Sequence, residues 1–283
     1  MVKPSTAEPA YVMVSPTDLA IRPGETVQLH ARLFDAKGEF VREEKAATWA
    51  PVGLKGNATP DGKFTAAPAD SQAGTVKATV GALSGVSRIR VLSHLPLTEN
   101  FDAMPAGAPP RYWINTTTKY EVRDVEGKKY LAKLADNAAT KRARSFFGMN
   151  NEHDYTIEGD VMAIEKRRQL GDAGIVAQRY QLVIFGNAQR LELQPWQPET
   201  ERTVVHEFAW KKDTWYHLKL RVENMPGGKV KAQGKAWPTG EPEPAAWLVE
   251  RIDPIGNREG APGIYADAPF EVYFDNIKVT SNQ

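Results

Sequence analysis

The 283-residue sequence predicts an all-β chain that folds into two β-sandwiches. Short segments of alternating apolar and polar residues recur along the chain, and turns rich in Gly and Pro separate them. Segments of this kind at close spacing are typical of antiparallel sandwiches. Almost no stretch has the apolar spacing of a helix. At this length, two domains are more economical than one.

The closing segment, residues 263–280, is the most informative part of the chain. It reads as two short strands joined by a turn that contains Pro269. The polar pair Asp275-Asn276 interrupts the apolar alternation of the second strand, and such an interruption predicts a bulge or a bend. The apolar positions of that strand are Phe270, Val272, Phe274, Ile277 and Val279.

Composition excludes several classes of function. Lys and Arg number 36 against 35 Asp and Glu, so bulk charge gives no reason to expect a nucleic-acid partner. The chain has no cysteine, which rules out disulfides, zinc-thiolate sites and thiol catalysis. No run of apolar residues is long enough for a membrane-spanning helix. The sequence also lacks a nucleophile elbow, a His-Glu-x-x-His motif and a phosphate-binding loop.

Three segments are expected along the chain. Residues 1–9 are rich in Pro, Ser, Thr and Ala, and they predict a flexible linker without the apolar core of a signal peptide. Residues 10–93 form the first predicted sandwich and residues 94–283 the second. Strands of the first are expected at residues 11–14, 26–34, 47–50, 62–65, 74–80 and 86–92.

The first sandwich resembles bacterial Ig-like (group 2) domains. The matching features are Val-Ser-Pro near the start, Pro-Gly-Glu-Thr before a long strand, a central Thr-Trp, Asp-Gly-Lys-Phe, and a closing Gly-Thr-Val-Lys-Ala-Thr. Each motif is loose, and the resemblance lies in their order.

About a dozen strands are expected in the second sandwich. They are predicted at residues 120–123, 129–134, 143–147, 155–164, 173–178, 180–185, 190–194, 203–208, 215–222 and 229–237, followed by the closing pair. Four segments in order, namely residues 171–176, 213–222, 235–247 and 274–279, resemble the concanavalin A-like/laminin-G-like jelly roll. The sequence of these segments resembles C-terminal modules of secreted bacterial proteins with quinoprotein-like β-propellers. It is also distantly similar to the 3-keto-disaccharide hydrolase family.

Strand alternation predicts a polar face on the second sandwich. Because side chains alternate along a strand, apolar residues assign one face to the core and leave the others outside. Carboxylates, amides, cations and Trp on one concave sheet suit a sugar ligand, whereas any solvent-facing sheet is also polar. The candidate ligand-binding residues are Glu158, Asp160, Glu192, Gln194, Trp196, His217, Arg221, Gln233, Lys235 and Trp237.

A glycoside hydrolase or lyase is the first alternative. Hydrolysis of a glycoside usually needs two carboxylates on opposite sides of the scissile bond. Glu158, Asp160 and Glu192 could form such a cluster on adjacent strands. Against this chemistry, Glu165 lies too far along the chain to complete the Glu-x-Asp-x-x-Glu spacing of jelly-roll endoglucanases.

A calcium site is a further candidate. Asp102 and Asp275 fall on segments that are often neighbours in such folds, and carboxylate oxygens are ligands of Ca²⁺. The same residues are equally suited to turns and bulges. Two basic clusters, residues 141–144 and 166–168, could contact an acidic polysaccharide, but we interpret them as solvated loops.

These observations predict a non-catalytic carbohydrate-binding or adhesion module with a glycan partner. We expect it to be joined to other domains of a larger bacterial protein that is secreted, periplasmic or on the cell surface. A second alternative is a structural or protein-interaction module that supports a β-propeller. A structural Ca²⁺ is the only cofactor the sequence suggests.

Overall fold

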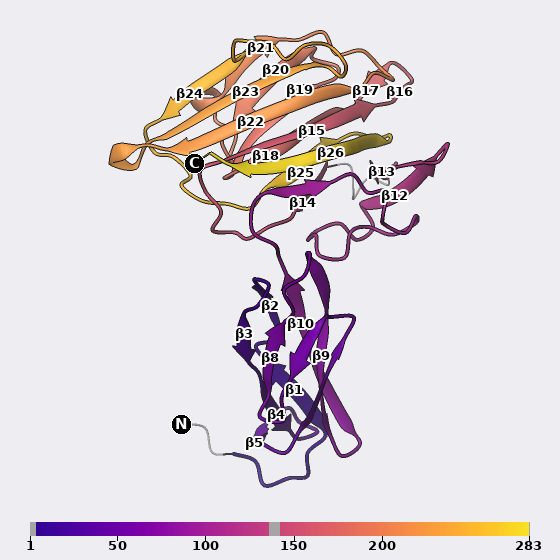
Figure 1. The fold of residues 1–283 in the computed structure, drawn as a ribbon, viewed down its shortest axis with the longest axis vertical. Coiled ribbons are helices and arrows are strands. Elements are labelled where there is room, and N and C mark those ends of the chain that lie inside the picture. Colours follow the sequence, from indigo (N-terminus) through magenta and orange to yellow (C-terminus); the bar gives the residue numbers. More distant parts are fainter. Residues whose placement is uncertain (1–3, 136–141, 283) are drawn as a thin grey trace. The chain divides into compact units, whose positions relative to one another are not determined.

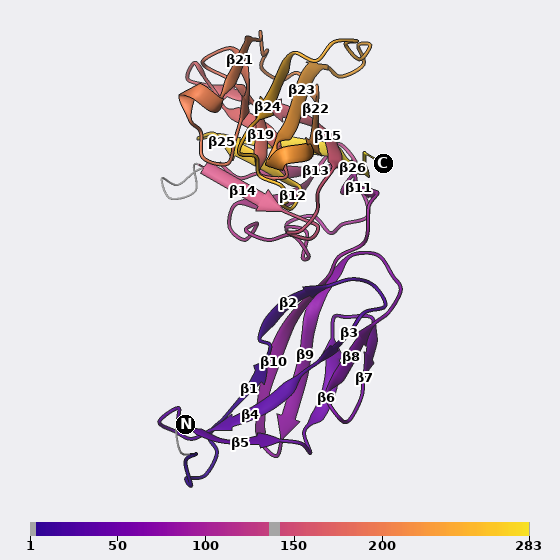
Figure 2. The same cartoon turned by 90° about the vertical axis from the view of Figure 1, so that its left-hand side faces the viewer.

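The computed structural model describes residues 4–135 and 142–282. It confirms the all-β fold class: the described elements are strands and two short 3-10 turns, Thr200–Arg202 and Pro226–Gly228. The chain divides into two compact units, Met1–Ser93 and His94–Gln283. Figures 1 and 2 show the strands of each unit in two views. No described helix has the length and apolar character that a membrane crossing requires.

The N-terminal unit contains three small sheets. The first has the order β1 (Tyr11–Ser15), β4 (His30–Phe34) and β5 (Phe40–Glu44). The second has the order β2 (Asp18–Ile21), β10 (Leu83–Val91), β9 (Gln72–Val80) and β6 (Thr48–Val52). The third has the order β3 (Thr26–Gln28), β8 (Lys63–Ala66) and β7 (Gly56–Ala58).

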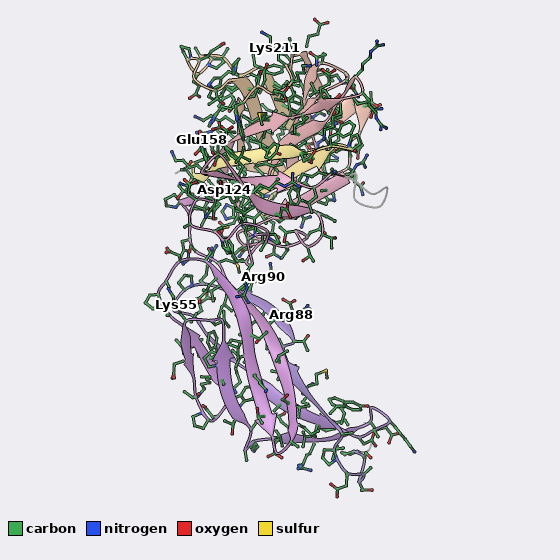
Figure 3. The ribbon with its side chains drawn as sticks, turned by 90° about the vertical axis from the view of Figure 1, so that its right-hand side faces the viewer. Lys55, Arg88, Arg90, Asp124, Glu158 and Lys211 are labelled. Atoms are coloured by element: carbon green, nitrogen blue, oxygen red, sulfur yellow. The ribbon has the colours of Figure 1, made fainter. Side chains whose placement is uncertain are left out.

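The long strand predicted at residues 26–34 is divided in two. Its first part, β3, pairs with β8, and its second part, β4, pairs with β1 and β5. The division falls at Leu29, which is buried in the core and donates its N–H to the carbonyl of Gly62. Alternation continues through Leu29, so the sequence pattern alone could not reveal the change of sheet. Arg88 projects from β10 and pairs with Asp18 at 3.1 Å, an exposed contact of small energetic weight (Figure 3).

The C-terminal unit is a sandwich of two large sheets. The eight-stranded sheet has the order β12 (Tyr120–Val125), β13 (Lys128–Lys133), β26 (Val272–Ser281), β15 (Tyr155–Ala163), β22 (Tyr216–Asn224), β23 (Val230–Pro238) and β24 (Val249–Asp253), with β11 (Leu97–Glu99) also paired to β26. The six-stranded sheet has the order β14 (Arg142–Phe146), β25 (Gly263–Asp267), β18 (Asp172–Ala177), β19 (Tyr180–Phe185), β20 (Arg190–Gln194) and β21 (Val204–Glu207). A small hairpin, β16 (Glu165–Lys166) and β17 (Gln169–Leu170), stands apart.

The core lies between these two sheets, and strand alternation predicted its members. Ile157 and Val161 of β15 and Leu191 of β20 are fully buried in one cluster that draws on both sheets. Burial of such side chains contributes about 1.5–3 kcal/mol each, which explains why the alternation is so regular here.

The bulge predicted at Asp275-Asn276 is confirmed. The register between β15 and β26 shifts between Glu158 and Asp160, so that Asn276 and Ile277 of β26 stand opposite Gly159 alone and one extra residue is accommodated. Asn276 has a φ of 48°, a left-handed conformation that asparagine tolerates better than most residues. The shift keeps Phe274 and Ile277 in the core on either side of the bulge.

Candidate functional site

The ten predicted ligand-binding residues lie on two opposite outer faces, not on one. Strands β15, β22 and β23 belong to the eight-stranded sheet, whereas β20 belongs to the six-stranded sheet. The prediction of a single face was therefore wrong, because alternation assigns a residue to a face but not a strand to a sheet. The eight-stranded sheet carries Glu158, Asp160, His217, Arg221, Gln233, Lys235 and Trp237, and the other sheet carries Glu192, Gln194 and, just after β20, Trp196.

On the eight-stranded sheet, the two carboxylates are already paired. Glu158 projects outward from β15 (Figure 3) and lies 3.4 Å from the ammonium of Lys278 and 3.5 Å from that of Lys219. Asp160 accepts from His217 Nδ1 at 2.6 Å and from Asn276 Nδ2 at 2.7 Å. These carboxylates therefore hold neighbouring strands together.

The remaining polar residues of this face are also engaged with each other. Arg221 pairs with Glu223, and the Gln233 amide donates to Glu250 at 2.5 Å. Lys235 is buried, donates to the carbonyl of Pro244 at 2.7 Å and pairs with Glu243 at 2.8 Å. Trp237 is only 9% exposed and packs beside His217, with ring centroids 4.7 Å apart. Few of the polar groups among the predicted residues of this sheet are therefore free to bind a ligand.

The carboxylate cluster proposed for glycoside hydrolysis does not assemble. Glu192 lies on the other sheet, away from the strand that carries Glu158 and Asp160. The neighbouring His217 ring and the Lys219 ammonium lower the pKa of Glu158 to about 2. A carboxyl with so low a pKa is ionised at neutral pH and cannot act as the general acid that the reaction needs.

His217 lies between two carboxylates, which makes the stability of this sheet depend on pH. Burial opposes protonation of the ring, but the contacts to Asp160 and Glu158 outweigh it and raise the pKa of His217 to about 9. The unfolded-state pKa is about 6.5, so this contribution is complete below that value and is lost as the pH rises through about 9. Between pH 6 and pH 10 we expect a loss of about 1–3 kcal/mol in the free energy of unfolding.

Urea denaturation at several pH values measures this dependence. His217→Gln is expected to remove most of it, whereas His206→Gln, an exposed histidine on β21, serves as the matched control. Equal pH profiles for the wild type and His217→Gln would show that the cluster does not titrate as described.

The two predicted calcium ligands differ in their surroundings. Asp102 is exposed in the turn after β11, whereas Asp275 is buried and pairs with the Lys128 ammonium at 2.8 Å. Burial and the neighbouring Asp160 raise the pKa of Asp275, and the contact with Lys128 opposes them. No group of three or more His, Asp or Glu side chains in residues 4–135 and 142–282 is arranged to hold a metal ion. Calcium binding stays a prediction. Beside Asp275, the more buried of the two candidate ligands, the Lys128 ammonium already lies where a cation would bind.

The six-stranded sheet presents a different outer face. The strand registers align Arg144, Tyr265, Gly174, Val183 and Glu192 in one row across it. Small and apolar residues form the middle of the row, and polar residues stand on both sides. A second, parallel row includes Phe146, Gly263, Val176, Gln181 and Gln194.

Arg144 lies across the floor of this face. Its guanidinium carbon is 5.0 Å from the ring centroid of Trp196 and 5.2 Å from that of Tyr265. Its Nε donates to Gln181 Oε1 at 2.9 Å. Burial lowers the pKa of the Arg144 guanidinium, while burial and the neighbouring Asp267 raise the pKa of Tyr265 to about 12. The tyrosine hydroxyl is therefore protonated at neutral pH.

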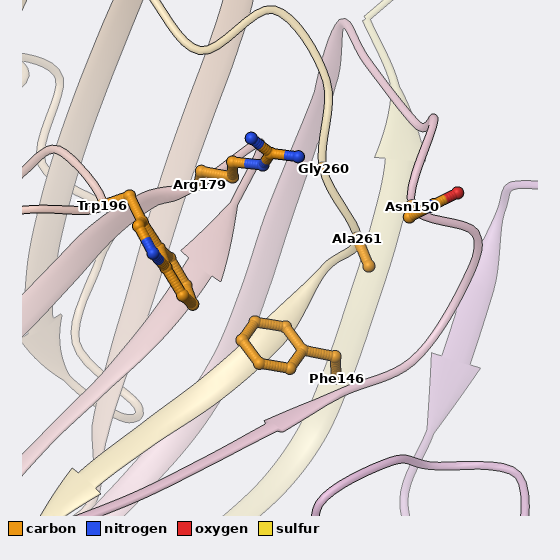
Figure 4. Close-up of a pocket in the computed structure, with 6 residues that line it drawn as sticks. All are labelled: Phe146, Asn150, Arg179, Trp196, Gly260 and Ala261. Carbon is orange, nitrogen blue, oxygen red and sulfur yellow. The ribbon is translucent and has the colours of Figure 1, made fainter.

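A cavity of about 270 Å³ opens beside these residues (Figure 4). The rings of Trp196 and Phe146 lie next to each other on one side of it, with centroids 5.9 Å apart, and Arg179 stands on another side. Trp196 is 38% exposed, and an exposed ring of this size over a cavity is a common feature of ligand sites. The cavity is lined by Phe146, Asn150, Arg179, Trp196, Gly260 and Ala261.

A buried hydrogen-bond network holds the walls of the cavity in place. The Tyr155 hydroxyl donates to the carbonyl of Gly260 at 2.8 Å and accepts from the N–H of Gln178 at 2.7 Å. The Gln178 amide in turn donates to Asn224 Oδ1 and to the carbonyl of Asn257, both at 2.8 Å. This network ties the β18–β19 turn, which carries Arg179, to the loop that carries Gly260.

Sequence reasoning missed Arg144, Gln181 and Tyr265 as candidate site residues. Arg144 was interpreted as part of a solvated basic loop, but it lies on β14. The signal was available in the alternation: Ala143 and Ser145 are buried, whereas Arg144 and Phe146 share the other face. Lys141 of the same cluster lies outside the described residues.

Several solved structures are similar to this chain at low identity. An alginate lyase, Aly36B, in complex with alginate tetrasaccharide matches with 12% identity over 66% of this chain and 96% of its own, with a TM-score of 0.45. A protein of unknown function with a galectin-like fold from Bacillus subtilis matches with 12% identity, 62% and 97% coverage and a TM-score of 0.40. An endo-β-1,4-glucuronan lyase from the fungus Trichoderma reesei matches with 12% identity, 65% and 94% coverage and a TM-score of 0.38. No protein-family model and no curated protein sequence matches the chain.

Proposed function

We propose that the C-terminal unit is a glycan-binding module whose ligand lies on the outer face of the six-stranded sheet. The observation that carries this proposal is Trp196, an exposed ring beside a cavity and in contact with Arg144. Sugar rings stack on indole through their apolar faces, and their hydroxyl groups bond to nearby amides and charged groups. The proposal includes the secreted bacterial setting that the sequence resemblance implies.

The two outer faces differ in how many of their polar side chains are already bonded and in how accessible their tryptophans are, and both differences favour the six-stranded sheet. Most predicted binding residues of the eight-stranded sheet are already bonded to neighbouring side chains or backbone, and Trp237 is nearly buried. On the six-stranded sheet, Trp196 remains accessible and polar groups surround it. Of the ten residues predicted from the sequence, Glu192, Gln194 and Trp196 lie on this sheet. Glu192 is bonded to Arg190 and to Gln194, so we retain Trp196 as the candidate for ligand contact.

A glycan array on the purified chain, run with calcium and with chelator, tests the proposal. Any glycan that binds is then titrated against Trp196→Ala and Trp237→Ala. We expect Trp196→Ala to weaken binding about five- to thirtyfold, because one stacked ring contributes about 1–2 kcal/mol, and Trp237→Ala to leave the affinity nearly unchanged.

Two results would contradict the proposal. Loss of binding in Trp237→Ala alone would move the ligand to the eight-stranded sheet. A folded protein that binds no glycan would favour the structural or protein-interaction role. A fall in affinity with chelator would support the calcium prediction.

A further inference from the structure

We infer that the glycan bound on the six-stranded sheet is acidic, and that Arg144 and the side-chain amide of Gln181 bind its carboxylate or sulfate group. This inference rests on the proposed function and names the ligand class for the same site. Three observations carry it: two arginines without an ion pair to a described residue, a buried amide without a hydrogen-bond acceptor, and an exposed aromatic ring that contacts Arg144 and lines a cavity together with Arg179.

The arginines of this face fall into two groups. Arg142 pairs with Asp267 at 3.0 Å, and Arg190 pairs with Glu192 at 2.5 Å. Among the described residues, no carboxylate forms an ion pair with Arg144, although this side chain is half-buried. Asp267 is near enough to act on Arg144 electrostatically, but its carboxylate is bonded to Arg142. A partly desolvated cation without a direct ion pair is costly, and a ligand anion would lower that cost.

Gln181 supplies an unused donor at the same place. Its side chain is 1% exposed, and its Nε2 has no hydrogen-bond partner within the described part of the chain. The amide orientation is fixed by chemistry: Arg144 can only donate, so the atom that faces it must be the amide oxygen. The NH₂ group therefore points elsewhere, and buried amides of this kind normally have an acceptor.

Arg179 adds a second cation, in the cavity that Trp196 also lines. It lies at the β18–β19 turn with a φ of 65° and lines the cavity. Its side chain makes no ion pair with any described residue, and the backbone of Gly260 packs against it so closely that a Cβ there would approach Arg179 Cγ to 2.9 Å. The turn thus presents an exposed guanidinium at the edge of the cavity.

An acidic sugar satisfies all of these groups together. A guanidinium binds a carboxylate or sulfate through parallel N–H donors, and the Gln181 NH₂ can donate to the same oxyanion. The sugar ring can then stack on Trp196, and the next acidic sugar of the glycan can reach Arg179, which lines the same cavity. Glu192 does not oppose this charge, because Arg190 and the Gln194 amide, both at 2.5 Å, neutralise and bond it.

Calorimetric titration of the full chain tests the inference with four oligosaccharides of equal length. The probes are hexamers of glucuronate and galacturonate, a sulfated galactan hexamer, and neutral cellohexaose. We expect at least one acidic probe to bind at least about tenfold more tightly than cellohexaose, with an affinity that falls as salt rises.

Matched variants assign the effect to residues. Arg144→Gln is expected to lower the affinity for the acidic probe at least about tenfold, and Arg144→Lys, which keeps the charge but not the paired donors, to lower it less. Arg179→Gln is expected to lower it several-fold. Arg167→Gln, in the exposed β16–β17 turn, is the control and is expected to bind as the wild type does. Melting curves verify that each variant is folded.

The outcomes separate this inference from the proposed function. Equal affinity for neutral and acidic probes, or an unchanged affinity of folded Arg144→Gln and Arg144→Lys for the acidic probe, would overturn the inference and leave glycan binding intact. Absence of binding to every glycan would overturn both. Binding of only the uronate probes assigns the site to carboxylates, and binding of only the sulfated probe assigns it to sulfate.

Discussion

Replacing Tyr155 with phenylalanine is expected to lower the free energy of unfolding of the C-terminal unit by about 2–4 kcal/mol. The hydroxyl bonds to the carbonyl of Gly260 and to the N–H of Gln178, and the tyrosine is fully buried. Phenylalanine fills the same space but leaves two buried backbone groups unpaired, each at a cost of about 1–3 kcal/mol. Chemical denaturation followed by tryptophan fluorescence measures the change.

The same substitution reports on the site. Gly260 and the turn after Gln178 form walls of the cavity, so Tyr155→Phe should also weaken glycan binding. Tyr130→Phe is the matched control, because Tyr130 is half-buried and its hydroxyl has no hydrogen-bond partner among the residues that the structure describes. A loss below about 1 kcal/mol for Tyr155→Phe would contradict the role given to this network.

Gly174→Ala is expected to destabilise the unit by about 3 kcal/mol and to disturb the floor of the site. A Cβ at this position would lie 2.3 Å from the carbonyl oxygen of Leu182 and 2.9 Å from the Cα of Val183. Both are backbone atoms of β19, so the clash cannot be relieved by a side-chain rotation. The β18–β19 pairing must shift, and Gln181 and Arg144 shift with it.

Thermal melting compares this variant with Gly159→Ala on β15. There the added methyl would first meet a side-chain atom, Ile277 Cγ1, at 3.3 Å, and a shift of a few tenths of an ångström relieves the contact. Alanine also has a lower conformational entropy cost than glycine in a strand, by about 0.5–1 kcal/mol, so Gly159→Ala should be close to neutral. Equal melting temperatures for Gly174→Ala and the wild type would contradict the close packing of β18 on β19.

Strand alternation predicted which residues face the core, because burial of apolar side chains imposes it directly. Tyr155, Ile157 and Val161 were assigned inward from their spacing, and all are buried. The bulge at Asp275-Asn276 was visible for the same reason, since two polar residues break a regular pattern. These features depend on neighbours along the chain.

The composition of the site could not be obtained in the same way. Alternation identifies the outward-facing residues of both β15 and β20. It does not reveal that hydrogen bonding places these two strands in different sheets. Glu158 and Glu192 were therefore grouped although they lie on opposite faces. Trp237 was a candidate for ligand binding, yet the His217 ring and the surrounding chain nearly bury it. Strand order depends on contacts between distant segments, which a single sequence does not display.

NMR observation of the tryptophan indole N–H groups, during titration with the uronate hexamer that binds more tightly, shows directly which sheet holds the glycan. The chain has seven tryptophans, and Trp→Phe variants assign their signals. We expect the Trp196 signal to shift in a saturable manner, while the signals of Trp237 on β23 and of Trp215 just before β22 stay in place. A titration that shifts Trp237 or Trp215 and leaves Trp196 unchanged would contradict this expectation.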